Sequence, residues 1–292
     1  MKTCAKTRKI VPLVLALLLL FGGCSAVNRA AVFGTNGNET TRRQDVLTVE
    51  FLDVGQANAA LLTCGGKSLL IDGGNVADGA KVTRAVRTVT DRLDYVVNTH
   101  GHEDHVGGLP AVVDAVPVGQ AIVSPVTADS EYYRDFVDAL ADRGVTPVAG
   151  QAGMQFSLGD AKCTVLGPVA AGSDLNNSSL VLQVRFGGAT FLFMGAAGAE
   201  EERSLIQSGA DVSCDVLAVG HHGSDSATGY VFLRQALPKY AVISVGAGNR
   251  YGHPAESTLS RLRDAGCTVY RTDQSGTITI VTDKNGKIRC PA

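Results

Sequence analysis

The 292 residues are 45% hydrophobic, 18% charged and 5% aromatic, with no tryptophan. This apolar content is ample for a core and excludes a wholly disordered chain, and the length suits one large domain or two small ones. The net charge is −2, but removing residues 1–23, with their four basic side chains, leaves 22 basic against 28 acidic residues. We therefore do not expect a groove that binds nucleic acid through charge alone.

The amino terminus has the pattern of an export signal. A basic segment over residues 1–9 precedes twelve apolar residues from Ile10 to Phe21. This run is short for a membrane span, which needs about 20 residues, and fits a signal peptide. It ends in Phe21-Gly22-Gly23-Cys24, which resembles the lipobox of bacterial lipoproteins. We predict a lipoprotein signal peptide over residues 1–23, lipidation of Cys24 and an extracytoplasmic domain anchored to the bacterial cell membrane; an uncleaved anchor is the alternative.

Residues 24–46 lack hydrophobic periodicity, which predicts a flexible tether before one domain over residues 47–292. Short apolar runs bounded by turn residues predict strands: 49–52, 59–63, 67–71, 93–99, 120–123, 161–166, 180–186, 190–194, 216–219, 240–245, 268–270 and 276–281. Helical spacing predicts helices at 77–93, 130–142, 200–207, 230–236 and 256–264. Strand pairs followed by strands that alternate with helices favour an α/β sandwich.

The cysteines and one acidic run receive structural interpretations. Five cysteines remain after Cys4 and Cys24 are set aside, an odd number without a C-x-x-C pair, so neither a disulfide framework nor a zinc ribbon is indicated. The run Glu200-Glu201-Glu202 is expected to be the solvated start of a helix, where acidic side chains suit the helix dipole.

The segment His100-Gly101-His102-Glu103-Asp104-His105 places three imidazoles and two carboxylates within six residues, directly after an apolar strand. These side chains cannot all face one ion from a regular helix or strand, but a tight loop can divide them between two adjacent ions. Imidazole and carboxylate suit Zn²⁺ or Mn²⁺, which lower the pKa of bound water toward 7. The motif therefore predicts one or two divalent ions; a solvated polar loop is the alternative.

The other three histidines also follow predicted strands. His221-His222-Gly223-Ser224 follows the run at 216–219, and His253 follows the strand at 240–245. We therefore expect all six histidines in glycine-bearing loops at strand ends, and none on the face of a helix or strand.

These sequence motifs resemble those of the metallo-β-lactamase-fold hydrolases, and among them those of the extracytoplasmic hydrolase domain of ComEC-type competence proteins, which act in DNA uptake. The shared phrases are Phe51–Gln56, Ile71–Gly74, Asn98–Gly108, Asn176–Leu180, His221–Ser224 and Gly252–Pro254. The resemblance extends from about Leu47 to Ile280. It implies an αββα sandwich with a metal site at one edge of two facing sheets.

The resemblance also implies roles for single residues. His100 and His102 would hold one ion, and Asp104 and His105 the other, which His221 or His222 completes. Asp104 and His222 are the predicted catalytic residues. Supporting roles near the metals fall to the remaining candidates: Asp72, which would orient the loop, Ser179, Ser224 and His253. Arg250 and Arg271 are candidates for contact with a phosphate.

Two positions depart from the family's pattern. The family reads Gly-Asp after the strand at 190–194, and that aspartate bridges the two metals, whereas this chain has Gly195-Ala196. A methyl group cannot coordinate a cation; Glu200, Glu201, Asp174 or Asp225 would have to substitute for the carboxylate. In addition, an early phrase that usually ends Gly-Gln-Gly-Asp here reads Gly55-Gln56-Ala57-Asn58.

The leading hypothesis is a membrane-tethered, metal-dependent hydrolase in which metal-bound hydroxide attacks a phosphodiester of nucleic acid or a nucleotide. A degenerate, non-catalytic lipoprotein that binds nucleic acid or a partner is the alternative that Ala196 favours. A hydrolase of a lactone, lactam or thioester is a third reading, because the fold alone does not fix the bond cleaved. The expected partners are a phosphodiester or small-molecule substrate, DNA as one option, and the membrane; the sequence indicates no protein partner.

Overall fold

The computed structural model describes residues 45–291. The predicted signal peptide over residues 1–23, the lipidated Cys24 and nearly all of the tether lie outside the described residues and stay predictions. Within residues 45–291, no helix has the length and apolar character that crossing a membrane requires. The first strand begins at Val46, one residue before the predicted start of the domain.

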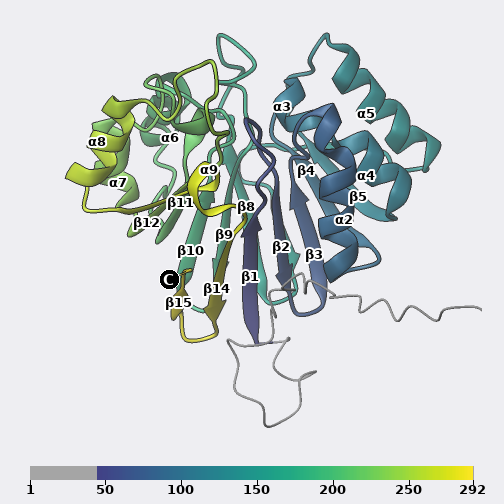
Figure 1. The fold of residues 1–292 in the computed structure, drawn as a ribbon, viewed down its shortest axis with the longest axis horizontal. Helices are drawn as coiled ribbons and strands as arrows, with labels where there is room; N and C mark the ends of the chain where they lie inside the picture. The colour runs from purple at the N-terminus through teal and green to yellow at the C-terminus, as the bar shows by residue number, and fades with distance from the viewer. Residues whose placement is uncertain (1–44, 292) are drawn as a thin grey trace, which may run out of the picture. The chain divides into compact units, whose positions relative to one another are not determined.

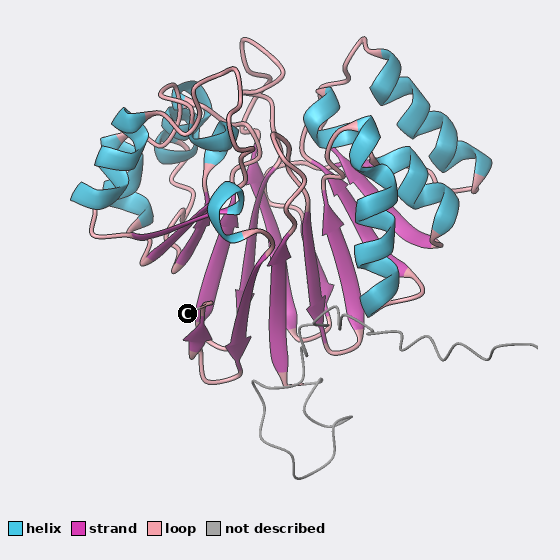
Figure 2. Cartoon of the chain, in the orientation of Figure 1, coloured by secondary structure: helices cyan, strands magenta, loops and turns pink. Residues whose placement is uncertain are grey.

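Two β-sheets form the centre of the molecule (Figures 1 and 2). The first has the order β15-β14-β1-β2-β3-β4-β5-β6 and the second β13-β12-β11-β10-β9-β8-β7. The strands of the first sheet are β1 (Val46–Phe51), β2 (Ala60–Cys64), β3 (Lys67–Ile71), β4 (Leu93–Asn98), β5 (Val118–Val123), β6 (Val148–Ala149), β14 (Ile278–Asp283) and β15 (Ile288–Arg289). Those of the second are β7 (Gln155–Leu158), β8 (Ala161–Gly167), β9 (Val181–Phe186), β10 (Ala189–Phe193), β11 (Val216–Ala218), β12 (Tyr240–Ile243) and β13 (Thr268–Arg271).

The facing sides of the two sheets form the central core. In β1 every second residue is buried, as expected for a strand with one face in a core. Leu47, Val49 and Phe51 pack in one apolar cluster with residues of the opposite sheet, and the rings of Phe51 and Phe193 lie 5.8 Å apart. Burial of such large apolar side chains, at about 2 kcal/mol each, favours closure of the two sheets.

Helices cover the outer face of each sheet, on opposite sides of the molecule (Figure 1). The helices on the first sheet are α2 (Gly79–Val89), α4 (Leu109–Ala115) and α5 (Glu131–Asp142), and their apolar faces share one cluster with that sheet. The helices on the second sheet are α6 (Ala199–Gln207), α7 (Tyr230–Ala236) and α8 (Glu256–Asp264). The predicted αββα sandwich is therefore confirmed.

Residues 45–291 also contain four short helical turns, most of which the sequence did not predict. Two single-turn helices are α3 (Glu103–Val106) and α9 (Thr272–Ser275), and two 3-10 turns are η1 (Val76–Asp78) and η2 (Gly220–Gly223). Because α3 contains His105, the expectation that every histidine lies in a loop is wrong for this residue, whereas His221 and His222 in η2 have non-helical backbone dihedral angles. The five cysteines of the described part are all free: Cys64, Cys163, Cys214, Cys267 and Cys290.

The acidic start of α6 is not solvated as predicted. Glu201 and Glu202 are only 2% and 4% exposed. The Glu201 carboxylate accepts a hydrogen bond from the amide of Val169 at 3.0 Å, and Glu202 accepts from the amides of Thr228 and Gly229. The prediction failed because these buried partners come from loops distant in sequence, which the helical pattern does not show.

Glu201 makes stability depend on pH, because burial raises its pKa to about 7 from an ordinary value of 4.5. The folded state then binds more protons than the unfolded state between these values, so the free energy of unfolding falls as the pH rises through this range. We expect Glu201→Gln to be more stable than wild type by about 2 kcal/mol at pH 8 and not at pH 4.5. Urea unfolding at both pH values tests this, and an equal difference at the two would contradict it.

Candidate metal centre

The topology brings the candidate residues to one edge of the sandwich. β3 and β4 are parallel in the first sheet, and β10, β11 and β12 are parallel in the second. The carboxyl ends of parallel strands share an edge, where open α/β sheets bind ligands. Asp72 follows β3, His100 follows β4, His221 follows β11, and His253 lies in the connection after β12.

Two glycine pairs allow the loops after β3 and β4 to approach closely. The amide of Gly73 donates to the carbonyl of His105 at 2.7 Å, and the amide of Gly108 donates to that of Gly74 at 3.0 Å. A Cβ atom at Gly73 would lie 2.7 Å from the amide nitrogen of Leu109, and one at Gly108 would overlap the carbonyl oxygen of Gly73. The paired glycines therefore position Asp72 beneath the histidine-rich segment.

Asp72 is a buried hydrogen-bonding hub. Its carboxylate accepts from the Thr99 amide at 2.8 Å, the Thr99 hydroxyl at 2.7 Å and the Asn98 side chain at 3.3 Å. His105 Nδ1 lies 2.7 Å from Asp72 Oδ2, and both side chains are 1% exposed. Because a carboxylate only accepts, Nδ1 of His105 carries the proton and Nε2 is the nitrogen left for other partners. Metal-ligating histidines are typically oriented in this way.

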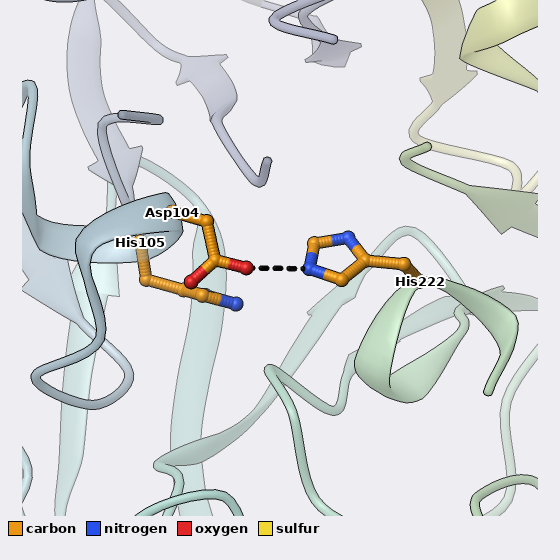
Figure 3. Close-up of side chains that lie close together, drawn as sticks. All are labelled: Asp104, His105 and His222. Atoms are coloured by element: carbon orange, nitrogen blue, oxygen red, sulfur yellow. Dashed lines mark hydrogen bonds and ion pairs between the residues drawn. The ribbon is translucent and has the colours of Figure 1, made fainter. Parts of the chain in front are cut away.

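Asp104, His105 and His222 point their ligand atoms at one another (Figure 3), all within 4.8 Å. His222 Nδ1 donates to the carbonyl of Ser244 at 2.8 Å, while its Nε2 lies 3.0 Å from Asp104 Oδ2. In neutral His222 both of these facing atoms are acceptors, so a cation or a second proton is needed between them. In the described part of the chain this is the one group of three such ligands.

The electrostatics of these groups favours an anionic Asp104. Burial disfavours its charge, but His105 and His222 outweigh burial and hold the pKa of the Asp104 carboxyl below its usual range. Burial also opposes a charge on His105, yet Asp72 and Asp104 raise the pKa of its imidazole. One carboxylate and two imidazoles with fixed Nε2 atoms fit Zn²⁺ or Mn²⁺ and leave a coordination position open.

His100 and His102 form a second pair beside this group. His100 Nε2 and His102 Nδ1 face each other at 3.1 Å, and the rings of His100 and His105 lie 4.1 Å apart. Burial lowers the pKa of His100 well below its ordinary value, and the neighbouring histidines lower it further. A neutral His100 retains a lone pair for a metal, but this pair has no carboxylate of its own within the described residues.

Ser179 contacts Ala196, the residue that stands where the family has its bridging aspartate. Its hydroxyl accepts from the amide of Ala196 at 3.1 Å and lies 3.3 Å from His100 Nδ1. Ala196 is buried, with 1% of its surface exposed. None of the four carboxylates considered as substitutes belongs to the metal-ligand group of Asp104. Three of them bind backbone amides elsewhere: Glu200 that of Ser173, Glu201 that of Val169 and Asp174 that of Asn177. The fourth, Asp225, also lies outside the group.

The structure distinguishes the two adjacent histidines that the sequence left equivalent. Both have left-handed backbones, with φ of 50° at His221 and 53° at His222, a conformation that non-glycine residues adopt rarely and mainly at functional sites. This geometry directs His222 toward Asp104. His221 instead packs against His253 with ring centroids 5.6 Å apart. Burial, together with the neighbouring His222 and His253, lowers the pKa of His221 to about 4.

The remaining candidates lie around this centre. His253 stacks on His222 at 6.4 Å, and its buried Nδ1 has no hydrogen-bond partner. The Ser224 hydroxyl accepts from the amide of Ser226 at 3.3 Å, which caps the following turn. Arg271 is engaged by Asp273 through two contacts of 3.0 and 2.6 Å. Sequence reasoning missed Ser244, since a backbone carbonyl leaves no signal in residue type.

A family model described as the metallo-beta-lactamase superfamily matches residues 52–247. The chain belongs to this superfamily. ComE operon protein 3 of Bacillus subtilis (strain 168) is 34% identical over 188 residues, which cover 64% of this chain and 24% of that protein. Competence protein ComA of Neisseria gonorrhoeae is 32% identical over 240 residues, 80% of this chain and 32% of that protein. The resemblance to ComEC-type competence proteins is thereby confirmed.

The fold also resembles that of known structures. The metallo-beta-lactamase fold protein YhfI of Bacillus subtilis aligns over 85% of this chain and 100% of its own, with a TM-score of 0.53 and 13% identity. At this identity the likeness supports the fold alone. The chain spans 24% and 32% of the two competence proteins, so their whole activities do not transfer to it directly.

Proposed function

We propose that this member of the metallo-beta-lactamase superfamily is a metal-dependent hydrolase of phosphodiester bonds, with one divalent ion held by Asp104, His105 and His222. The observation that carries the proposal is the convergence of these three ligand atoms within 4.8 Å, each imidazole with its Nδ1 bound by an outer partner. Such pre-oriented donors with an open position are typical of catalytic metal sites.

The chain's own residues would hold and orient the reactants. When bound, a divalent ion supplies Lewis acidity and activates water as the nucleophile, so no covalent protein nucleophile is needed. Asp104 provides the anionic ligand, and Asp72 and Ser244 fix the rings of His105 and His222 through their Nδ1 atoms. His100, which burial keeps neutral, lies directly beside this group with His102 and would accept a hydrogen bond from water or from a substrate hydroxyl.

The choice of phosphodiesters is supported by the relatives and by one motif. One relative is named a competence protein, and the other, ComE operon protein 3, belongs to the same ComEC-type group. The motif His221-His222-Gly223-Ser224 resembles one that is typical of that group. The acidic chain favours a short or locally bound substrate over long duplex DNA. The predicted lipid anchor would place this activity outside the cytoplasm, at the membrane.

Ala196 favours a second candidate function, a non-catalytic protein that binds nucleic acid or a partner at this site. Ala196 is buried, its backbone amide binds the Ser179 hydroxyl, and its methyl group contributes no ligand. The two functions differ in metal content and turnover. A full-length protein that binds neither Mn²⁺ nor Zn²⁺ and hydrolyses no phosphodiester would support the second.

The test measures hydrolysis of bis(p-nitrophenyl) phosphate by the full chain with Mn²⁺, with Zn²⁺ and with a chelator. We expect activity only with a metal, and we expect Asp104→Asn to lower kcat/KM by at least about 100-fold, since it removes the one anionic ligand. Asp142→Asn, at the exposed end of α5, is the matched control and should retain wild-type activity. Full activity of Asp104→Asn would exclude the proposed metal ligand.

A further inference from the structure

An exposed tyrosine lies at the rim of the metal centre. Tyr251 is 57% exposed, so its ring is accessible to a ligand from solvent. It belongs to the loop between β12 and α8, two residues before His253. The proposed catalytic chemistry does not use it.

Stacked rings connect Tyr251 to the metal-ligand group. Its ring lies 5.8 Å from that of His253, with 22° between the planes. His253 in turn lies 6.4 Å from His222, again at 22°. Because His222 Nε2 is 3.0 Å from Asp104, one intermediate ring separates Tyr251 from the proposed reaction centre. A group stacked on the side of Tyr251 away from His253 would therefore lie at the rim of the centre, with the rings of Tyr251 and His253 between it and His222.

The loop that carries Tyr251 is fixed by hydrogen bonds despite its exposure. The Asn249 side-chain oxygen accepts from the amides of Tyr251 and His253, each at 3.1 Å. Its nitrogen donates to the carbonyls of Gly246 and His253, and Gln56 accepts from the amide of Gly246 at 3.0 Å. A pre-organised aromatic surface loses little entropy when a ligand binds to it.

Arg250 adds a cation to this surface. Its guanidinium carbon lies 5.0 Å from the centroid of the Tyr251 ring, and Nη2 donates to the Tyr251 hydroxyl at 3.0 Å. No carboxylate within residues 45–291 forms a salt bridge with Arg250, in contrast to Arg271, which Asp273 engages twice. A weak contact with a ring leaves the guanidinium available to an incoming phosphate.

We propose that Tyr251 and Arg250 form a nucleoside subsite: a base stacks on the Tyr251 ring, and Arg250 leaves the ring to pair with the phosphate. The inference rests on the proposed phosphodiesterase function and assigns its substrate class, single-stranded nucleic acid or a nucleotide. Stacking tolerates every base, and duplex bases are already stacked on one another, so this subsite selects an unpaired nucleotide.

The experiment compares two substrates with the same leaving group, the p-nitrophenyl ester of thymidine 5′-monophosphate and methyl p-nitrophenyl phosphate. We expect Tyr251→Ala to lower kcat/KM about ten-fold for the thymidine ester and less than two-fold for the methyl ester. Tyr251→Phe should retain the wild-type ratio. Tyr230→Ala, at a 54% exposed tyrosine of α7, is the matched control and should change neither rate. Arg250→Gln should lower both rates alike, because both substrates carry the phosphate.

Equal losses on both esters, or no loss on the thymidine ester, would overturn the subsite while leaving the phosphodiesterase function intact. If the wild type hydrolyses neither ester, the proposed function fails first. The subsite is then tested by fluorescence anisotropy of a labelled oligothymidylate against an abasic strand of equal length. A preference for the bases that Tyr251→Ala abolishes supports the subsite, and the absence of any preference overturns it.

Discussion

Replacing Ala196 with aspartate is expected to raise the Mn²⁺ content from one ion per chain to two. The Ala196 amide binds Ser179, whose hydroxyl is 3.3 Å from His100 Nδ1, so residue 196 lies close to His100, a member of the pair that lacks a carboxylate. Two imidazoles and a carboxylate would then match the ligand set of the neighbouring group. Elemental analysis after dialysis against Mn²⁺ measures the change.

The same variant gives a readout that is independent of activity. Without metal, Ala196→Asp places a charge at a position that is only 1% exposed, and we expect the free energy of unfolding to fall by about 2 kcal/mol. Excess Mn²⁺ should restore it, whereas Ala196→Asn, of equal size but uncharged, should not respond. Thermal unfolding with a chelator and with Mn²⁺ checks both variants. One ion per chain in Ala196→Asp, with no stabilisation by Mn²⁺, would contradict the prediction.

Asp72→Ala is expected to have the largest effect on stability. It leaves the Thr99 amide, the Thr99 hydroxyl and His105 Nδ1 buried without an acceptor, which costs about 3–5 kcal/mol. It also releases the orientation of the His105 ring, and loss of such an outer partner typically weakens metal affinity about 10–100-fold. Urea unfolding of the metal-free protein and calorimetric titration with Mn²⁺ measure the two effects separately.

Asp160→Ala provides the control for this substitution, because Asp160 is an exposed aspartate that forms a 3.5 Å ion pair with Lys284. Such surface pairs contribute little, so stability and metal affinity should change by less than about 1 kcal/mol. Asp72→Asn should retain part of the hydrogen bonding and lie between the two. If Asp72→Ala bound Mn²⁺ as tightly as the wild type, His105 would not depend on Asp72 for its orientation.

Local sequence patterns predicted most of the fold because most helices and strands show their buried face as a hydrophobic periodicity within their own residues. The helices over 230–236 and 256–264 and the strand over 67–71 occur where the sequence placed them. The pattern missed α4, which begins at Leu109-Pro110 directly after two glycines, and β7, whose residues are mostly exposed and give no clear alternation. Both elements are fixed by contacts with neighbours rather than by their own periodicity.

The candidate site was predictable in its residue types and less so in its geometry. Strand ends identified the histidines, because parallel strands collect such residues at one edge. The distinction between His221 and His222 depended on two left-handed backbone conformations, and the burial of Glu201 depended on a loop distant in sequence. Neither feature is encoded in a short window of sequence.

Asp104 and His105 follow a strand of the first sheet, whereas His222 follows a strand of the second. An ion bound by all three therefore cross-links the two halves of the sandwich at their open edge. An ion that binds only the native arrangement stabilises it, so the metal would contribute to the stability of the fold as well as to catalysis. Chelation would consequently weaken the association of the halves, and a single loss of metal would remove both the chemistry and part of the rigidity that supports it.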